Sequence, residues 1–153
     1  MLILYDEMCN ELYTLANDIL YQSNFDLQKD LIKLLTRLLR YGDNKIRNNV
    51  MNLSENIINS TNFYVRRLYF VFFEECFNVL STKFLFEKKI VNNLFKLLND
   101  SCPLNVIHFF KFIPKFYFFL KDEMNLKFLI DSKIHNLKSS NSKDAELLSV
   151  YLY

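Results

Sequence analysis

The sequence predicts an all-α protein, a short right-handed α-α superhelix of about four helical hairpins. Gly occurs once and Pro twice in 153 residues, so the turns that strands and barrels require are largely missing. Apolar residues make up 51% of the chain and charged residues 24%, which is the balance of a folded protein. An internal repeat is the third observation.

The chain matches itself when it is displaced by 40 residues. The apolar residues that meet are Val50 and Ile90, Ile57 and Leu97, Ile58 and Leu98, Tyr69 and Phe109, Phe70 and Phe110, Phe72 and Phe112, Phe73 and Ile113, Val79 and Phe119, and Leu80 and Leu120. A repeat of this length is typical of a helical solenoid, in which each unit covers the apolar face of its neighbour. The sequence therefore predicts one repeat domain over residues 1–153.

Apolar residues at helical spacing predict four pairs of helices. The pairs are 2–21 with 26–41, 44–59 with 64–80, 86–98 with 104–121, and 124–137 with 144–153. The clearest repeats cover 44–80 and 86–121, and we expect 1–41 and 124–153 to cap the two ends.

In the first pair, residues 2–21 present one apolar helix face and Asp26 is expected to N-cap the second helix. We expect Gly42 to end that helix, because glycine readily adopts the left-handed conformation of a C-cap.

The second pair begins at Asp43, after which residues 44–59 form a helix. Residues 60–62 are polar and predict a turn that caps the helix over 64–80. That helix is apolar on several sides, so it is expected to lie between neighbouring repeats.

The third pair places a helix over 86–98 and a turn over 99–103. Pro103 suits the first turn of the helix over 104–121, because no N–H is needed there. Pro114 should kink the same helix.

Charge and cysteine usage exclude several classes of function. The net charge of +2 is spread without blocks of like sign, so neither nucleic acid nor an anionic membrane is an expected partner. The most apolar window, 104–120, is broken by charged residues and Pro114, so no membrane span is expected. Cys9, Cys76 and Cys102 are widely spaced, which favours reduced thiols in the cytoplasm, with the nucleus as the alternative.

Residue types that serve in catalysis or metal binding are few, and they are scattered along the sequence. His108 and His135 are the only histidines, and they do not form an H-x-x-x-H pair of the kind that holds a metal. Glu74 and Glu75 are adjacent, so on a helix they point about 100° apart. With one glycine, nucleotide-binding glycine loops are excluded. We expect no enzymatic activity, no cofactor and no metal.

Two stretches resemble HEAT repeats. The run Asn59-Ser-Thr-Asn-Phe-Tyr-Val-Arg-Arg67 looks like the turn and second-helix start of such a repeat. The run Leu97-Leu-Asn-Asp-Ser-Cys-Pro103, followed by Pro114, is similar to repeats in scaffold or regulatory subunits of type-2A-family and type-4 serine/threonine phosphatases. Val106 stands where the second repeat has Arg66, which departs from the pattern.

The resemblance implies a non-enzymatic scaffold that holds protein partners, with a phosphatase catalytic subunit among them. Such scaffolds bind along the ridge of turns within repeats and along the inner layer of second helices. The candidate partner-binding residues are Tyr64, Arg66, Arg67, Asn105 and Lys111. The alternative for Arg66 is a structural ion pair with an aspartate of the next turn, such as Asp100. The alternative for Tyr64 is that it packs within the fold and binds no partner.

Two further alternatives stay open. Asp43 and Arg47 also resemble a HEAT turn. The first alternative is therefore another register of the repeat, in which the helices over 26–41 and 44–59 form one pair. The second alternative is a compact all-α domain of another kind, either a small helical enzyme or a lipid carrier, in which the aromatic helices line an apolar cavity.

Overall fold

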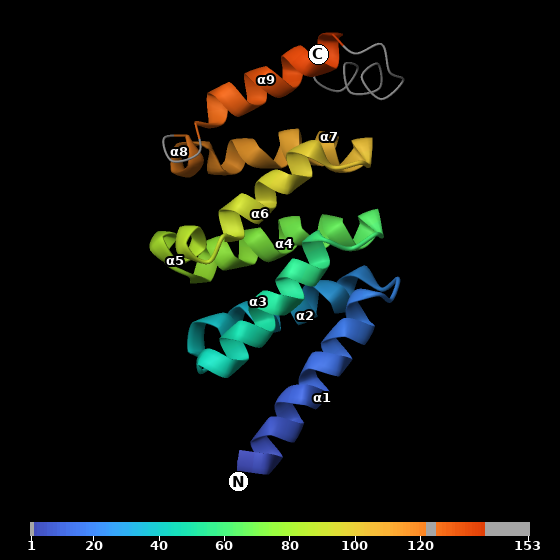
Figure 1. Cartoon of the computed structure of the whole chain (residues 1–153), viewed down its shortest axis with the longest axis vertical. Helices are drawn as coiled ribbons and strands as arrows, with labels where there is room; N and C mark the ends of the chain where they lie inside the picture. Colours follow the sequence, from blue (N-terminus) through green and yellow to red (C-terminus); the bar gives the residue numbers. More distant parts are fainter. Residues whose placement is uncertain (1, 122–124, 140–153) are drawn as a thin grey trace. The chain divides into compact units, whose positions relative to one another are not determined.

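The structure is a computed structural model that describes residues 2–121 and 125–139. Within these ranges the chain is helical and contains no strand, which confirms the predicted all-α class (Figure 1). The α-helices are α1 (Leu2–Leu20), α2 (Phe25–Tyr41), α3 (Asn44–Ile58), α4 (Phe63–Val79), α5 (Thr82–Glu87), α6 (Ile90–Lys96), α7 (Pro103–Phe112), α8 (Tyr117–Leu120) and α9 (Leu126–Ser139). Two 3-10 segments, η1 (Leu97–Asn99) and η2 (Ile113–Phe116), complete the described elements.

Helices α2 and α3 begin at polar residues whose side chains accept a hydrogen bond from a backbone N–H. Asp43 Oδ1 accepts from the Ile46 N–H at 2.9 Å and caps α3, as the sequence predicts. For α2 the prediction was wrong by two residues, because Asn24 is the N-cap and Asp26 lies in the first turn. Each cap satisfies one of the N–H groups that the start of a helix leaves unpaired.

Gly42 ends α2, but not in the way that the sequence suggests. Its φ of −73° and ψ of 162° are extended, so the predicted left-handed C-cap was wrong. A Cβ at this position would lie 2.5 Å from the Leu38 carbonyl oxygen and 2.7 Å from Cγ2 of Ile46. Glycine is therefore required because α2 and α3 approach too closely here for any side chain.

The predicted helix over 86–98 is divided into several pieces, which corrects the sequence-based expectation. Ser81 caps a short helix, α5, that ends at Glu87. Lys89 has a positive φ of 61°, and α6 begins at the next residue. A left-handed residue cannot continue a right-handed helix, so the chain breaks there.

The helix predicted over 104–121 begins where expected and is divided into α7, η2 and α8. Pro103 occupies the first turn of α7, and the α-helix gives way to the 3-10 segment η2 at Pro114. The helix predicted over 124–137 is α9. The helix predicted over 144–153 lies outside the described residues.

The chain divides into two compact units, Met1–Leu94 and Phe95–Tyr153, and each is described on its own. The single domain over residues 1–153 stays a prediction.

In the first unit, helices two apart in the sequence pack together. Helix α1 contacts α2 and α3, while α2 contacts α3 and α4. Helices α1 and α3 run in a similar direction, and so do α2 and α4 (Figure 1). The start of α6 joins them through two hydrogen bonds, from Tyr69 Oη to the Ile90 carbonyl at 3.2 Å and from Asn93 Nδ2 to Glu55 Oε1 at 2.7 Å.

Helix α4 supplies much of the core of this unit. It contacts α2, α3 and α5, in agreement with the prediction that several of its sides are covered. Its buried residues are Val65, Leu68, Tyr69, Phe70, Phe72, Phe73 and Cys76. The six-residue run from Leu68 to Phe73 contains one residue, Val71, that is not fully buried.

The second unit has a smaller core around α7. Val106 and Ile107 are buried, and Phe110 packs against them. The rings of Phe95 and Phe109 meet edge to face with centroids 5.4 Å apart. Helix α7 contacts η1 and η2.

Burial agrees with most of the 40-residue repeat. The positions buried in both copies are 50 and 90, 57 and 97, 58 and 98, 69 and 109, 72 and 112, and 73 and 113. Phe70 is 1% exposed, whereas Phe110 is only partly buried. The repeat therefore aligns a fully buried ring, Phe70, with one that is only partly buried, Phe110.

We predict that Phe70→Ala lowers the free energy of unfolding by about 3 to 5 kcal/mol, because it leaves a cavity at a fully buried position. Phe110→Ala should cost at least about 1 kcal/mol less, since part of that ring already meets water. Urea denaturation followed by circular dichroism measures both values. Equal losses at the two positions would contradict the difference in burial.

Candidate functional site

A groove lies on the first unit where two turns come together. One turn joins α1 to α2 over residues 21–24, and the other joins α3 to α4 over residues 59–62. The volume of the groove is about 530 Å³. It is lined by Leu20, Tyr21, Gln22, Ser23, Phe25, Gln28, Asn62, Tyr64, Val65, Arg67 and Leu68, and we call it the turn groove.

Three aromatic side chains stand exposed along the turn groove. Tyr21 is 58% exposed, Phe25 is 53% exposed and Tyr64 is 63% exposed. The Tyr64 ring lies against Phe63, with centroids 4.0 Å apart. Aromatic rings are costly to leave in water and are enriched where proteins bind one another.

Buried polar groups hold both turns in place. The buried Gln28 amide donates to the carbonyl of Leu20 at 2.9 Å and to that of Gln22 at 2.5 Å. Arg66 Nη1 donates to the carbonyls of Ser60 at 2.8 Å and Thr61 at 3.2 Å. The walls of the groove are thus fixed by hydrogen bonds before any ligand arrives, which lowers the entropy that binding must overcome.

The predicted site residues at the start of α4 fall into two kinds. Tyr64 is exposed and Arg67 is half-buried, and both line the turn groove. The guanidinium of Arg66 is half-buried and bonds to the backbone of its own turn. Removal of Arg66 would therefore disturb the turn itself, so this residue shapes the site.

The other two predicted residues lie in the second unit. Asn105 is 0% exposed, and its Nδ2 donates to Asp100 Oδ2 at 3.3 Å. Asn105 thus holds the turn before α7, and its contact with a partner stays a prediction. Lys111 is exposed in the last turn of α7.

Sequence reasoning missed Tyr21 and Phe25. Tyr21 was the last residue of a predicted helix and Phe25 lay just before the next, and apolar periodicity does not distinguish an exposed aromatic residue at such a place from a packed one. A usable signal was present, since Tyr21 and Phe25 flank one turn as Phe63 and Tyr64 follow the next.

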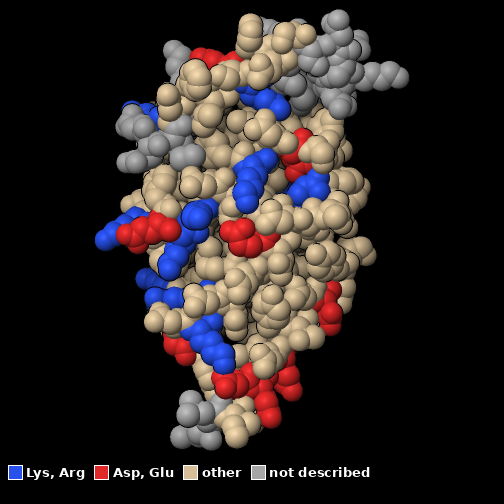
Figure 2. All heavy atoms as spheres, in the orientation of Figure 1, with Lys and Arg blue, Asp and Glu red and all other residues tan. Residues whose placement is uncertain are grey.

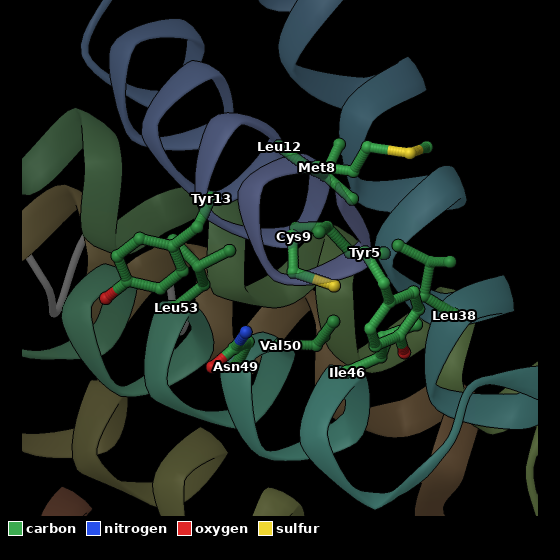
Figure 3. A pocket seen from close by; sticks show the side chains of 11 residues that line it. Tyr5, Met8, Cys9, Leu12, Tyr13, Leu38, Ile46, Asn49, Val50 and Leu53 are labelled. Carbon is green, nitrogen blue, oxygen red and sulfur yellow. The ribbon is translucent and has the colours of Figure 1, made fainter. Parts of the chain in front are cut away.

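A second hollow is apolar and lies among α1, α2 and α3 (Figure 3). Its volume is about 270 Å³, slightly below the roughly 300 to 1,000 Å³ of sites for drug-sized ligands. It is lined by Tyr5, Met8, Cys9, Leu12, Tyr13, Leu35, Leu38, Ile46, Asn49, Val50 and Leu53. We call it the apolar pocket.

Polar contacts join α1 to the start of α3 beside this pocket. Tyr5 Oη donates to Asp43 Oδ2, and Lys45 Nζ donates to Asp6 Oδ1. The hydrogen bond to Asp43 raises the pKa of Tyr5. The Ile46 N–H and the Tyr5 hydroxyl hold the pKa of the Asp43 carboxyl below its usual value.

Buried groups with a reactive atom are kept neutral. Burial raises the pKa of the Cys76 thiol and that of the Tyr69 hydroxyl. A thiol is a poor nucleophile while it stays protonated, so Cys76 serves as a small core residue. Among the residues that the structure describes, no three His, Cys, Asp or Glu side chains converge as a metal site requires.

Comparisons with models of protein families, with curated proteins and with solved structures found no match to this chain. The resemblance to HEAT repeats therefore rests on the quoted residues alone. In the described ranges, no helix combines the length and the hydropathy that crossing a bilayer needs.

We predict that Asp43 makes the stability of the fold depend on pH in the acidic range. Its pKa is lowered in the folded state, so its contribution is present above the unfolded value, 3.8, and is lost as the pH falls through the folded value. Asp43→Asn keeps a capping oxygen but carries no charge. The melting temperature of the wild type should exceed that of Asp43→Asn at pH 7, and the difference should shrink below about pH 4.

Thermal melts at a series of pH values measure this difference. Asp18→Asn on the exposed side of α1 corrects for the general loss of one negative charge from the same unit. A gap between wild type and Asp43→Asn that stays constant down to pH 2 would contradict the assignment.

Proposed function

We propose that this chain is a non-enzymatic protein-interaction module built of HEAT-like repeats, and that a protein partner docks in the turn groove. The observation that carries the proposal is the cluster of Tyr21, Phe25 and Tyr64 beside Arg67 on two successive turns. Tyrosine and arginine side chains dominate the energy of protein interfaces.

The repeat architecture is supported by the packing of the first unit. Contacts between α1 and α3, and between α2 and α4, are those that stacked helical hairpins make. The burial of equivalent positions 40 residues apart supports the same arrangement. Under this proposal the chain is a right-handed superhelix of about four hairpins, and the turn groove belongs to its ridge of turns within repeats.

The chemistry of the turn groove favours a protein over other ligands. Its floor is apolar, from Leu20, Val65 and Leu68, and its rim carries amides, hydroxyls and one guanidinium. This combination of an apolar centre and a polar rim is typical of protein interfaces. A partner segment with an apolar side chain for the floor and a carboxylate for Arg67 would fit best.

A finer proposal is a regulatory subunit of a serine/threonine phosphatase. Support comes from the turn over residues 97–103, which resembles that branch of HEAT proteins. In this turn Asp100 Oδ1 accepts from the Cys102 N–H at 2.7 Å, and Pro103 begins α7. The free thiols of Cys9, Cys76 and Cys102 fit a reducing compartment, the cytoplasm or the nucleus.

Binding should depend on the turn groove. We predict that the double variant Tyr64→Ala/Arg67→Glu binds its partner at least about tenfold more weakly, because it removes an aromatic anchor and reverses a charge. Affinity capture of the full chain with mass spectrometry identifies the partner, and titration calorimetry measures its dissociation constant. Arg66 is left unchanged because it holds the turn.

The matched control is Tyr41→Ala/Arg40→Glu, which makes the same two changes on the exposed end of α2. This control should bind like the wild type. Equal binding by both double variants would exclude the turn groove. Capture of partners other than a phosphatase catalytic subunit would refute the finer proposal and leave the interaction module standing.

A second candidate function is carriage of a small apolar ligand, and the apolar pocket favours it. We expect a saturable rise in the fluorescence of N-phenyl-1-naphthylamine if the pocket is accessible. Asn49→Phe should abolish the rise, because a ring placed at the pocket wall fills it, whereas Tyr64→Ala should have no effect. A rise that is linear in dye, or one that survives Asn49→Phe, would exclude the pocket.

A further inference from the structure

A small hollow lies where the turn between α2 and α3 meets the turn between α4 and α5. Its volume is about 300 Å³, at the lower limit of sites for small molecules. Its polar lining residues are Arg40 of α2, Arg47 of α3 and Ser81, and its apolar lining residues include Leu80 and Phe84. We call this hollow the arginine pocket.

The two arginines bring positive charge to the pocket without a carboxylate to balance it. No Asp or Glu is among the described residues that line the pocket, and none of the ion pairs between described residues involves Arg40 or Arg47. The Arg40 guanidinium instead lies 5.1 Å from the centroid of the Tyr41 ring. Two cations that share a hollow repel each other, and a bound anion would remove this cost.

One nitrogen of Arg47 is buried without a partner. Arg47 Nη2 donates to the Arg40 carbonyl at 3.1 Å, and this bond explains how Arg47 helps to end α2. Arg47 Nε, in contrast, is out of contact with water and has no hydrogen-bond acceptor among the described residues. A buried donor that pairs with nothing costs free energy, and such a group commonly marks the place of an ion or a water.

Ser81 adds a hydroxyl group to the same pocket. Its Oγ accepts from the Phe84 N–H at 3.3 Å, which fixes the side chain as the N-cap of α5. The hydroxyl hydrogen can still rotate toward an acceptor, because a serine oxygen accepts and donates at once. Leu80 and Phe84 are partly buried, so each offers some apolar surface to a ligand in the pocket.

The surroundings of the pocket are basic. Residues 40–47 and 81–89, which include the two turns, contain six Lys or Arg and two Asp or Glu. Lys and Arg side chains gather on the side of the first unit where α5 and the start of α3 lie (Figure 2). The field of these charges raises the local concentration of anions, although the net charge of the whole chain is only +2.

We infer that the arginine pocket binds a small organic phosphate monoester, with the phosphate beside Arg40 and Arg47 and the organic group against Leu80 and Phe84. A phosphate monoester carries close to two negative charges at pH 7, which matches the two arginines. Its oxygens point in several directions, so donors from α2, α3 and Ser81 can each reach one of them. A carboxylate offers only two oxygens in one plane, and it carries half the charge.

The phosphate also accounts for the unpaired nitrogen of Arg47. A planar guanidinium presents its N–H groups as a fork that suits the oxygens of phosphate. With a phosphate in the pocket, a small turn of the Arg47 side chain brings Nε to an acceptor, while Nη2 keeps the Arg40 carbonyl.

The arginine pocket is separate from the turn groove. The turn groove lies at the starts of α2 and α4, and the arginine pocket lies where these two helices end. Each helix has 17 residues, so the two sites are about 25 Å apart at a rise of about 1.5 Å per residue. The inference therefore goes beyond the proposed interaction module, and either proposal can fail without the other.

Nuclear magnetic resonance of the isotope-labelled full chain tests the inference, with phenyl phosphate as the probe and with the ionic strength held constant. The Nε–H signal of Arg47, assigned by its loss in Arg47→Lys, should shift in a saturable way as phenyl phosphate is added. Inorganic phosphate should bind more weakly, because it has no organic group to pack on Leu80 and Phe84. Benzoate, which has the same ring and a carboxylate, should bind at least about tenfold more weakly than phenyl phosphate.

Matched variants test the role of the arginines, and the backbone amide signal of Ser81 reports binding in each of them. Arg40→Gln should weaken the binding of phenyl phosphate at least about tenfold, because it removes one of the two charges beside the phosphate. The control is Arg37→Gln, which changes an exposed arginine of the same helix that does not line the pocket, and it should bind like the wild type. Arg47→Lys should also weaken binding, since it keeps the charge and loses the planar fork. Circular dichroism establishes that every variant is folded.

Four outcomes would overturn the inference. The first is an Arg47 Nε–H signal that does not respond to phenyl phosphate, and the second is equal weakening by Arg40→Gln and Arg37→Gln. The third is inorganic phosphate that binds as tightly as phenyl phosphate, which would refute the role of Leu80 and Phe84. The fourth is a Gly-phosphoserine-Gly peptide that binds more tightly than phenyl phosphate, which would identify a phosphorylated peptide as the ligand instead.

Discussion

Burial of α4 is the constraint on which the first unit depends. Phe70, Phe72 and Phe73 point in different directions around this helix, yet each is at most 1% exposed. Each such ring contributes roughly 1.5 to 3 kcal/mol when it leaves water, more than the roughly 1 kcal/mol of a helix cap. Helices α2, α3 and α5 lie where they do because α4 has apolar surface on several sides that must be covered.

Much of this fold is predictable from local signals in the sequence. The caps at Asp43 and Asn62, the proline at 103 and the interruption at Pro114 place helix boundaries to within a few residues. These signals work because each rests on a backbone group that has to be paired or on an N–H that proline lacks.

Other features were not predictable because they depend on tertiary contacts. Lys89 adopts a positive φ without any of the residues that usually announce one. Gly42 was interpreted through the conformation that glycine favours, whereas the contact with Ile46 is what requires it. Asn105 is a polar residue that looks exposed in the sequence and is buried as a hydrogen-bond donor.

The candidate site also has residues that local signals predict and residues that only tertiary contacts reveal. Tyr64 and Arg67 were found from their position at a helix start, and the structure adds Tyr21 and Phe25 from a turn more than thirty residues away. Periodicity identifies which side of a helix faces the core, but it does not tell which turns become neighbours. The turn groove therefore emerges only when α1 and α2 pack against α3 and α4.

The close contacts at Gly42 have a consequence for the turn between α2 and α3. The Leu38 carbonyl and the Ile46 side chain leave no room for a Cβ, so only glycine can take this conformation between α2 and α3. The path of the chain from α2 into α3 thus depends on one missing methyl group. The only glycine of the sequence therefore stands at the one turn whose backbone would reject every other residue in this conformation.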